Sequence, residues 1–187
     1  MVEEESGSRQ TVTDPHAWQD ISNGVIYVSN IIAALSKTDP ANAGRYRAAG
    51  DRYIATLRAL DADVRSQIEK IPSAKRRVIT SHDAFGYFGG TYGVAFLAPE
   101  GISTESEPSA TDLAKLIDQI KHEHITTLFV ENITDPRTID MIAKETGSKV
   151  GGALFSDALS PPDGAAPHYI DMFRNNVPKL VGAMLSN

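Results

Sequence analysis

The chain has 187 residues, and its 18 Lys and Arg against 24 Asp and Glu give a formal net charge of −6. This acidic balance argues against a nucleic-acid partner, which would need a basic surface. With 41% hydrophobic and 22% charged residues, the composition is that of a globular protein with a packed core. Cysteine is absent, which excludes disulfides and thiolate sites, so a metal would have to bind histidines and carboxylates.

The beginning of the chain does not resemble a targeting segment. The opening Met-Val-Glu-Glu-Glu-Ser-Gly lacks the basic start and the apolar run of a signal peptide. No stretch approaches the roughly 20 apolar residues of a membrane span. Residues 1–13 are acidic and have no apolar period, so we expect a flexible or partly ordered lead-in.

Two helices are predicted next. Apolar residues at helical spacing predict a short amphipathic helix over 21–35, which stops before Asp39-Pro40. Asp39 suits an N-cap and Pro40 the first helical position of a second helix, which runs until Pro72. At 1.5 Å per residue this helix is about 46 Å long, which is more than a small domain needs to cover one face. We interpret it as a helix that crosses between two bodies.

Beyond Pro72 the pattern changes to short apolar strands that alternate with helices. Strands are expected at 77–80, 94–97, 127–130 and 150–154, and helices start near Ser109, Asp135 and Tyr169. The aromatic residues Phe85, Tyr87 and Phe88 are expected in the core. Alternating strands and helices predict an α/β fold, with a parallel sheet that has helices on both faces.

Polar side chains follow three of the predicted strands. His82, Glu131 and Asp157 each come just after a strand, and parallel strands bring their carboxyl ends to one edge of the sheet. One imidazole and two carboxylates form a nitrogen and oxygen donor set that suits zinc or manganese. His16, in Asp-Pro-His-Ala-Trp, lies outside this sheet and would be a ligand from another body.

Each of these residues also has a purely structural interpretation. His82 could be a hydrogen-bonded histidine at a strand end, while Glu131 and Asp157 could be helix caps or loop carboxylates. His16 by itself is best explained as a turn histidine packed on Trp18. His122, His124 and His168 are expected to be solvated. Only the shared position of the three strand-end residues favours a site.

Several motifs occur together in a recognisable order. They are Asp14-Pro15-His16-Ala17-Trp18, the Asp39-Pro40 opening with Tyr46 and Tyr53, the run from Ser81 to Phe88, Phe129-Val130-Glu131, Thr146-Gly147, and Phe155-Ser156-Asp157 followed by Tyr169-Ile170-Asp171-Met172. As a set, covering nearly the whole chain from Asp14, they resemble the ZnuA-like zinc- and manganese-binding solute-binding proteins of ABC importers.

The resemblance implies two α/β lobes joined by one long helix, with the metal between the lobes and delivery to a membrane permease. Carried over by motif, it makes His16, His82 and Asp157 metal ligands and Glu131 an acidic residue near the site, less certainly a ligand. A histidine at position 82, where manganese binders often have glutamate, favours zinc over manganese. The implied location is periplasmic or otherwise extracytoplasmic.

The front of the chain departs from the family pattern. Family members have a whole N-terminal lobe that supplies another histidine ligand, and a signal peptide before it. We therefore interpret the chain as a C-terminal part: residues 1–38 as the remnant of that lobe, 39–71 as the linking helix and 72–187 as the metal-binding lobe. With three donors of four, and His16 without the sheet that should hold it, we expect weak zinc binding or none. Apolar stripes left open on the two helices predict self-association.

Three classes of function are left open. Metal capture for import needs no catalysis and a closed site. A metallohydrolase needs an open coordination position and a general base such as Glu131 near a bound water. An interaction domain, such as a surface adhesin, would use these carboxylates only structurally. The resemblance favours the first class, a protein that is not an enzyme.

Overall fold

The computed structural model describes residues 2–5, 8–11, 13–102 and 109–187. Where a flexible or partly ordered lead-in was expected, it has two short antiparallel strands, β1 (Val2–Glu5) and β2 (Ser8–Thr11). Residues 1, 6, 7 and 12 of that segment lie outside the described part. A short 3₁₀ turn, Ala17–Gln19, then leads into the first long helix.

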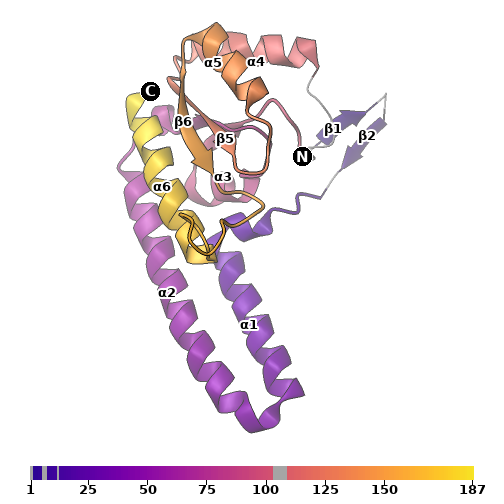
Figure 1. The fold of residues 1–187 in the computed structure, drawn as a ribbon, viewed down its shortest axis with the longest axis vertical. Helices are drawn as coiled ribbons and strands as arrows, with labels where there is room; N and C mark the ends of the chain where they lie inside the picture. The colour runs from indigo at the N-terminus through magenta and orange to yellow at the C-terminus, as the bar shows by residue number, and fades with distance from the viewer. Residues whose placement is uncertain (1, 6–7, 12, 103–108) are drawn as a thin grey trace.

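A helical hairpin follows and extends well beyond the rest of the molecule (Figure 1). Helix α1 (Ile21–Thr38) is capped by Asp20, whose side chain accepts a hydrogen bond from the backbone of Ser22. A 3₁₀ turn over Pro40–Asn42 connects it to α2 (Ala43–Glu69), which is about 40 Å long. Asp39 does not cap a backbone group of α2; its carboxylate accepts from the side chains of Asn42 and Tyr46.

The remainder is a parallel sheet with helices on both faces, as predicted. Its four strands lie in the order β4-β3-β5-β6. They are β3 (Arg77–Ile79), β4 (Ala95–Leu97), β5 (Thr127–Glu131) and β6 (Lys149–Leu154). The helices are α3 (Gly86–Tyr92), α4 (Ala110–His122), α5 (Arg137–Thr146) and α6 (Tyr169–Ser186), and a 3₁₀ turn at Ser73–Lys75 precedes β3.

Neighbouring strand residues point into two separate cores. Val78 packs on one face of the sheet with residues of α2, α3 and α6, whereas the next residue, Ile79, packs on the other face with α4 and α5. The first core also contains Ile21 of α1, so α1 begins against the sheet domain before it leaves with α2. Among the described residues, no helix is both long and apolar enough to cross a membrane.

Most predicted boundaries agree with the structure to within a few residues. Ser109 caps α4 through its side chain, and Gly147 ends α5 in the left-handed conformation at φ +75°. Helix α3 was not predicted, because its seven residues include three glycines, which are weak helix formers. It is held by Phe88, which is buried in the core. The division into 1–38, 39–71 and 72–187 stays a prediction.

Candidate metal site

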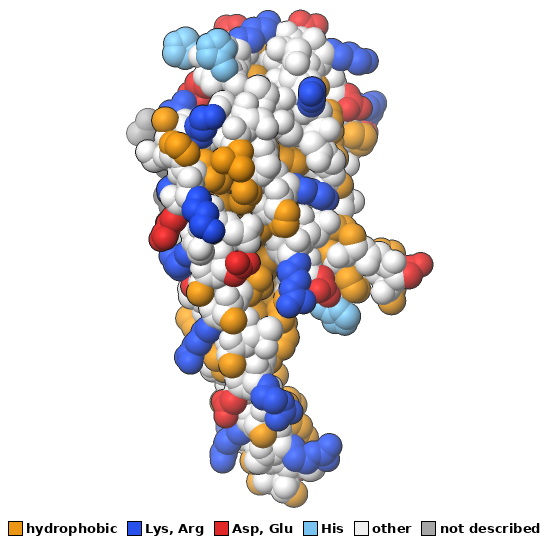
Figure 2. All heavy atoms as spheres, turned by 90° about the vertical axis from the view of Figure 1, so that its left-hand side faces the viewer, with side chains coloured by type: hydrophobic (Ala, Val, Ile, Leu, Met, Phe, Trp, Pro, Cys, Tyr) orange, Lys and Arg blue, Asp and Glu red, His pale blue; other side chains and the backbone are white. Residues whose placement is uncertain are grey.

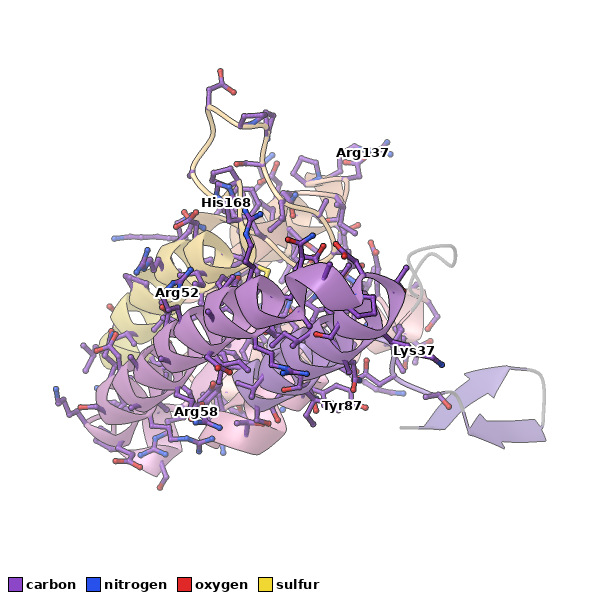
Figure 3. All side chains as sticks on the ribbon, turned by 90° about the horizontal axis from the view of Figure 1, so that it is seen from below. Lys37, Arg52, Arg58, Tyr87, Arg137 and His168 are labelled. Carbon is purple, nitrogen blue, oxygen red and sulfur yellow. The ribbon has the colours of Figure 1, made fainter. Side chains whose placement is uncertain are left out.

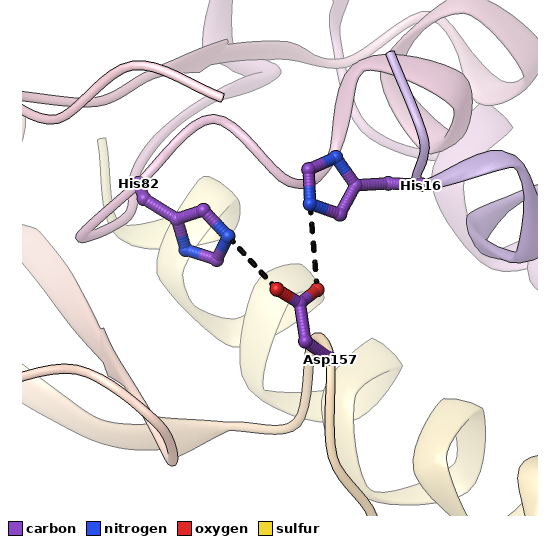
Figure 4. Close-up of side chains that lie close together, drawn as sticks. All are labelled: His16, His82 and Asp157. Carbon is purple, nitrogen blue, oxygen red and sulfur yellow. Dashed lines mark ion pairs between the residues drawn. The ribbon is translucent and has the colours of Figure 1, made fainter. Parts of the chain in front are cut away.

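Three of the predicted ligands converge at the carboxyl edge of the sheet. One donor atom each from His16, His82 and Asp157 lies within 4.8 Å of the other two. Both imidazoles direct Nε2 at the Asp157 carboxylate, at 3.5 Å from Oδ1 for His16 and 3.3 Å from Oδ2 for His82 (Figure 4). Residues that are 75 positions apart in the chain, 82 and 157, therefore meet at one point, as the strand-end pattern predicted.

His82 is held from behind by Glu131, the last residue of β5. The Glu131 carboxylate accepts a hydrogen bond from the His82 backbone N–H through Oε1 at 2.9 Å, and its Oε2 lies 2.6 Å from His82 Nδ1. Both side chains are fully buried. Nε2 of His82 makes no hydrogen bond of good geometry within the described part of the chain. A buried ring nitrogen that lacks a hydrogen-bond partner and faces a carboxylate fits the role of a metal ligand.

His16 is held by the short segment that carries it. The Asp14 carboxylate Oδ1 accepts from the His16 backbone N–H at 2.9 Å and lies 2.7 Å from His16 Nδ1. The imidazole packs edge-on against Trp18, with ring centroids 5.4 Å apart. His16 is therefore both the turn histidine packed on Trp18 and a member of the cluster, and it is only 2% exposed.

The segment around His16 is tied to the loop that carries Asp157. Trp18 Nε1 and Gln19 Nε2 both donate to the backbone carbonyl of Ser156, at 3.0 and 3.2 Å. Tyr169, at the start of α6, donates from its hydroxyl to the Trp18 carbonyl at 2.6 Å. The expectation that His16 lacks a support is therefore wrong, because the described part of the chain buries and fixes it.

Two asparagines anchor the Asp157 loop from the other side. Asn176 of α6 accepts from the Phe155 N–H at 3.0 Å and donates to the Phe155 carbonyl at 2.7 Å, and it is 3% exposed. Asn132, just after β5, donates to the Ala158 carbonyl at 3.1 Å. A cavity of about 240 Å³, lined in part by Trp18 and Asp157, opens beside the carboxylate and gives access to it.

The charges of the cluster stabilise one another. Burial lowers the pKa of His82, but the carboxylates of Asp157 and Glu131 outweigh it and raise that pKa to about 10. The pKa of His16 is raised as well, since Asp157 and Asp14 outweigh its burial. Burial works to raise the pKa of Asp157, yet hydrogen bonding to the two histidines holds it well below its usual range.

The structure separates Glu131 from the other three predicted residues. Its carboxylate lies on the Nδ1 side of His82, away from the point where the Nε2 atoms meet Asp157, and it is not a member of the three-residue cluster. His122, His124 and His168 are exposed, as expected, and His168 lies on the loop before α6, paired with Asp171 (Figure 3).

Sequence reasoning missed two of the residues that hold the ligands and their loops, Asp14 and Asn176. The role of Asp14 could have been predicted from its position two residues before His16, because an aspartate carboxylate often accepts a hydrogen bond from the backbone N–H two residues further on. Asn176 could also have been recognised, since it interrupts the apolar stripe Met172, Phe173, Val177 and Leu180 of the last helix. A polar residue on a buried face implies a hydrogen-bond partner.

Comparison with known proteins shows the family of this chain. The profile of ZnuA, described as zinc-uptake complex component A, periplasmic, matches residues 2–183. The chain belongs to the ZnuA family. It is similar to the metal ABC transporter substrate-binding lipoprotein SloC of Streptococcus mutans, 30% identical over 180 residues, which are 96% of this chain and 59% of SloC. It is also 33% identical to the iron-binding protein YfeA of Yersinia pestis over 171 residues, 91% of this chain and 55% of YfeA.

Solved structures of other periplasmic metal-binding proteins share the fold. The zinc-binding periplasmic protein TroA of Treponema pallidum aligns with a TM-score of 0.87 and 28% identity over 97% of this chain and 66% of TroA. A manganese-bound periplasmic metal-binding protein of Candidatus Liberibacter asiaticus aligns with a TM-score of 0.83 and 30% identity over 97% of this chain and 66% of that protein. The chain thus spans between half and two thirds of the length of these relatives, which is consistent with one lobe of a two-lobed protein.

Proposed function

We propose that this chain captures a divalent transition metal, zinc in preference to manganese, for delivery to the permease of an ABC importer outside the cytoplasmic membrane. The observation that carries the proposal is the convergence of His16, His82 and Asp157, whose donor atoms lie within 4.8 Å of one another. Relatives named as periplasmic proteins or lipoproteins support the extracytoplasmic location. The metal is the cargo of such a protein.

The donor set supports zinc as the preferred cargo. Two imidazole nitrogens and one carboxylate oxygen, each about 2 Å from a shared ion, form three corners of a tetrahedral zinc site. Manganese favours more oxygen donors and a higher coordination number than these three residues provide. The relatives are named variously for zinc, manganese and iron, so the preference rests on the donors of this chain.

A competition titration tests the proposal directly. Chelator-treated chain is titrated with zinc against a chromophoric chelator, and then with manganese. We expect zinc to bind at one site per chain, more tightly than manganese, and the variants His82→Ala and Asp157→Ala to lose this binding. His168→Ala removes an exposed histidine outside the cluster and should bind as the unchanged chain does. Equal affinity in all four proteins would contradict the proposal.

The strength of binding tests the number of donors. Three donors from this chain should bind zinc more weakly than a closed site with four, because each missing ligand lowers the affinity. We expect a version that is extended at the N-terminus by the corresponding lobe of a relative to bind more tightly than the chain by itself. An unchanged affinity would show that the three residues are sufficient.

The geometry gives little support to a metallohydrolase. Such an enzyme needs a general base within hydrogen-bond reach of a metal-bound water. Glu131, the residue suggested for that role, is fully buried and uses both carboxylate oxygens on His82. The relatives are solute-binding proteins, which also favours capture over catalysis.

A further inference from the structure

The two histidines of the cluster are held in the same way, although they lie on unrelated segments. In each case one carboxylate contacts both the backbone N–H of the histidine and Nδ1 of its ring. Asp14 does this for His16 from two residues upstream, and Glu131 does it for His82 from the neighbouring strand. The repetition points to a shared requirement at the cluster, because local turn geometry can explain only the first pair.

We propose that Asp14 and Glu131 are positioning residues that keep the hydrogen of each imidazole on Nδ1 and thereby leave Nε2 of both rings free to bind the metal. A carboxylate only accepts hydrogen bonds, so a ring nitrogen 2.6 or 2.7 Å from it must carry the hydrogen. Nε2 of each ring then faces Asp157, at 3.5 and 3.3 Å. The inference rests on the proposed function for its purpose, but the hydrogen position can be tested without metal.

Glu131 constrains its histidine more than Asp14 does. Its two oxygens have separate tasks, because Oε1 accepts from the His82 backbone and Oε2 contacts Nδ1. The side chains of His82 and Glu131 are both fully buried, and within the described residues Nδ1 and Oε2 have their mutual ion-pair contact at 2.6 Å and no hydrogen bond of good geometry. No water can replace a lost partner there without a rearrangement.

Replacing Glu131 by glutamine turns this arrangement into a sharp test. The amide oxygen of Glu131→Gln must face the His82 backbone N–H, since an NH₂ group there would place two donors against each other. The NH₂ group then faces Nδ1, which has to accept, so the ring hydrogen moves to Nε2. The side chain keeps its size, and the metal-binding nitrogen is blocked.

Asp14→Asn provides the contrast. A single atom of Asp14, Oδ1, serves both the His16 backbone and Nδ1. An asparagine oxygen in that place can accept both bonds, so His16 keeps its hydrogen on Nδ1. Asp171→Asn is the matched control, because Asp171 lies 3.1 Å from Nδ1 of His168, an exposed histidine outside the cluster.

The experiment reads the ring nitrogens by NMR. Chains with ¹⁵N-labelled histidine are compared without metal, at a pH where the ring signals are those of neutral imidazole, and with one equivalent of zinc. We expect Nδ1–H for His16 and His82 in the unchanged chain and in Asp14→Asn, and Nε2–H for His82 in Glu131→Gln. Zinc affinity should fall about 10–100-fold in Glu131→Gln, less in Asp14→Asn, and not at all in Asp171→Asn.

Two results would overturn the inference: a neutral His82 ring in the unchanged chain with its hydrogen on Nε2 instead of Nδ1, or an Nδ1–H in Glu131→Gln with unchanged zinc affinity. If Glu131→Gln does not fold, the unchanged chain still decides through its own ring-nitrogen signals. If the unchanged chain has the expected Nδ1–H pattern and binds no zinc, the proposed function fails while the positioning roles hold.

Discussion

At the scale of single residues, the carboxylates of the cluster favour a positive charge on or between the two imidazoles. Asp157 lies between two imidazoles, and both rings have a second carboxylate behind them. Without metal, protons on His16 and His82 supply the positive charge that the carboxylates favour, which is why both pKa values are raised. A metal ion would take the place of those protons, because only the unprotonated Nε2 can bind it.

Zinc binding should therefore release protons. With the pKa of His82 raised to about 10, this ring is charged at pH 7 and must lose its proton before it binds zinc. Calorimetric titrations at pH 7 in two buffers of different ionisation enthalpy should report the release of about one proton or more per zinc, and an affinity that falls as the pH is lowered. His168→Ala should release the same number. No proton release would contradict the assignment of His82.

The stability of the metal-free chain should depend on pH in a defined direction. A histidine with a raised pKa stabilises the fold fully below its unfolded pKa of about 6.5, and this contribution is lost as the pH rises through the folded value of about 10. The lowered pKa of Asp157 contributes above about pH 3.8 and is lost as the pH falls below it. We expect the melting temperature without zinc to fall between pH 7 and 10, and less so in zinc-saturated chain. A rising melting temperature in that interval would contradict the pairing.

At the scale of elements, the helical hairpin depends on one close approach. A Cβ atom at Gly50 of α2 would lie 2.1 Å from Cδ1 of Ile32 in α1. The absence of a side chain at Gly50 therefore leaves the space that Ile32 occupies. Gly44, on the same helix, has nothing within 4 Å of the equivalent position. The two glycines share a helix and differ in their surroundings, which makes them a matched pair.

Alanine at these two positions should have opposite effects. Gly44→Ala should stabilise the chain by about 0.5–1 kcal/mol through helix propensity alone. Gly50→Ala gains the same propensity but forces Ile32 to move, at a cost of about 1–3 kcal/mol, so we expect a net loss. Thermal unfolding of both variants measures the difference. Equal stabilisation by both would show that the helices are not in close contact at Gly50.

At the scale of the whole molecule, the hairpin exposes an apolar face. Between Ile21 and Ser36, α1 contains no charged residue, and Ile26, Tyr27, Ile31 and Leu35 are 42–55% exposed. Figure 2 shows the hairpin from the α2 side, where charged side chains are interspersed with hydrophobic ones. An uncharged helix face like that of α1 is typical of a surface that another polypeptide covers.

Self-association of the chain remains a prediction, and α1 is where it should occur. Sedimentation equilibrium should show a dimer whose fraction rises with concentration, and Ile31→Glu should weaken it about tenfold or more, because a charge would be buried at the contact. Thr56→Glu adds the same charge at an exposed position of α2 and serves as the control. A monomer at all concentrations, or equal weakening by both variants, would contradict the prediction.

The sequence by itself determined most of the elements and predicted that His82 and Asp157 meet at one edge of the sheet. Apolar periodicity and caps such as Ser109 and Gly147 are local signals, so they located the helices and strands to within a few residues. The strand-end positions of His82 and Asp157 also sufficed to predict that they meet, because parallel strands end at one edge. The short helix α3 was not predicted because its three glycines have low helix propensity, and the packing of Phe88 that holds it is a tertiary contact.

Only the tertiary structure decided what each polar residue does. Glu131 is the last residue of a strand and Asp157 follows one, but Glu131 contacts the Nδ1 side of His82 while Asp157 faces Nε2, and a one-dimensional pattern cannot distinguish these directions. The support of His16 depends on Trp18, Gln19 and Tyr169, whose hydrogen bonds span 137 to 151 positions of sequence. Contacts at such separation depend on how the chain packs, and no local propensity encodes them.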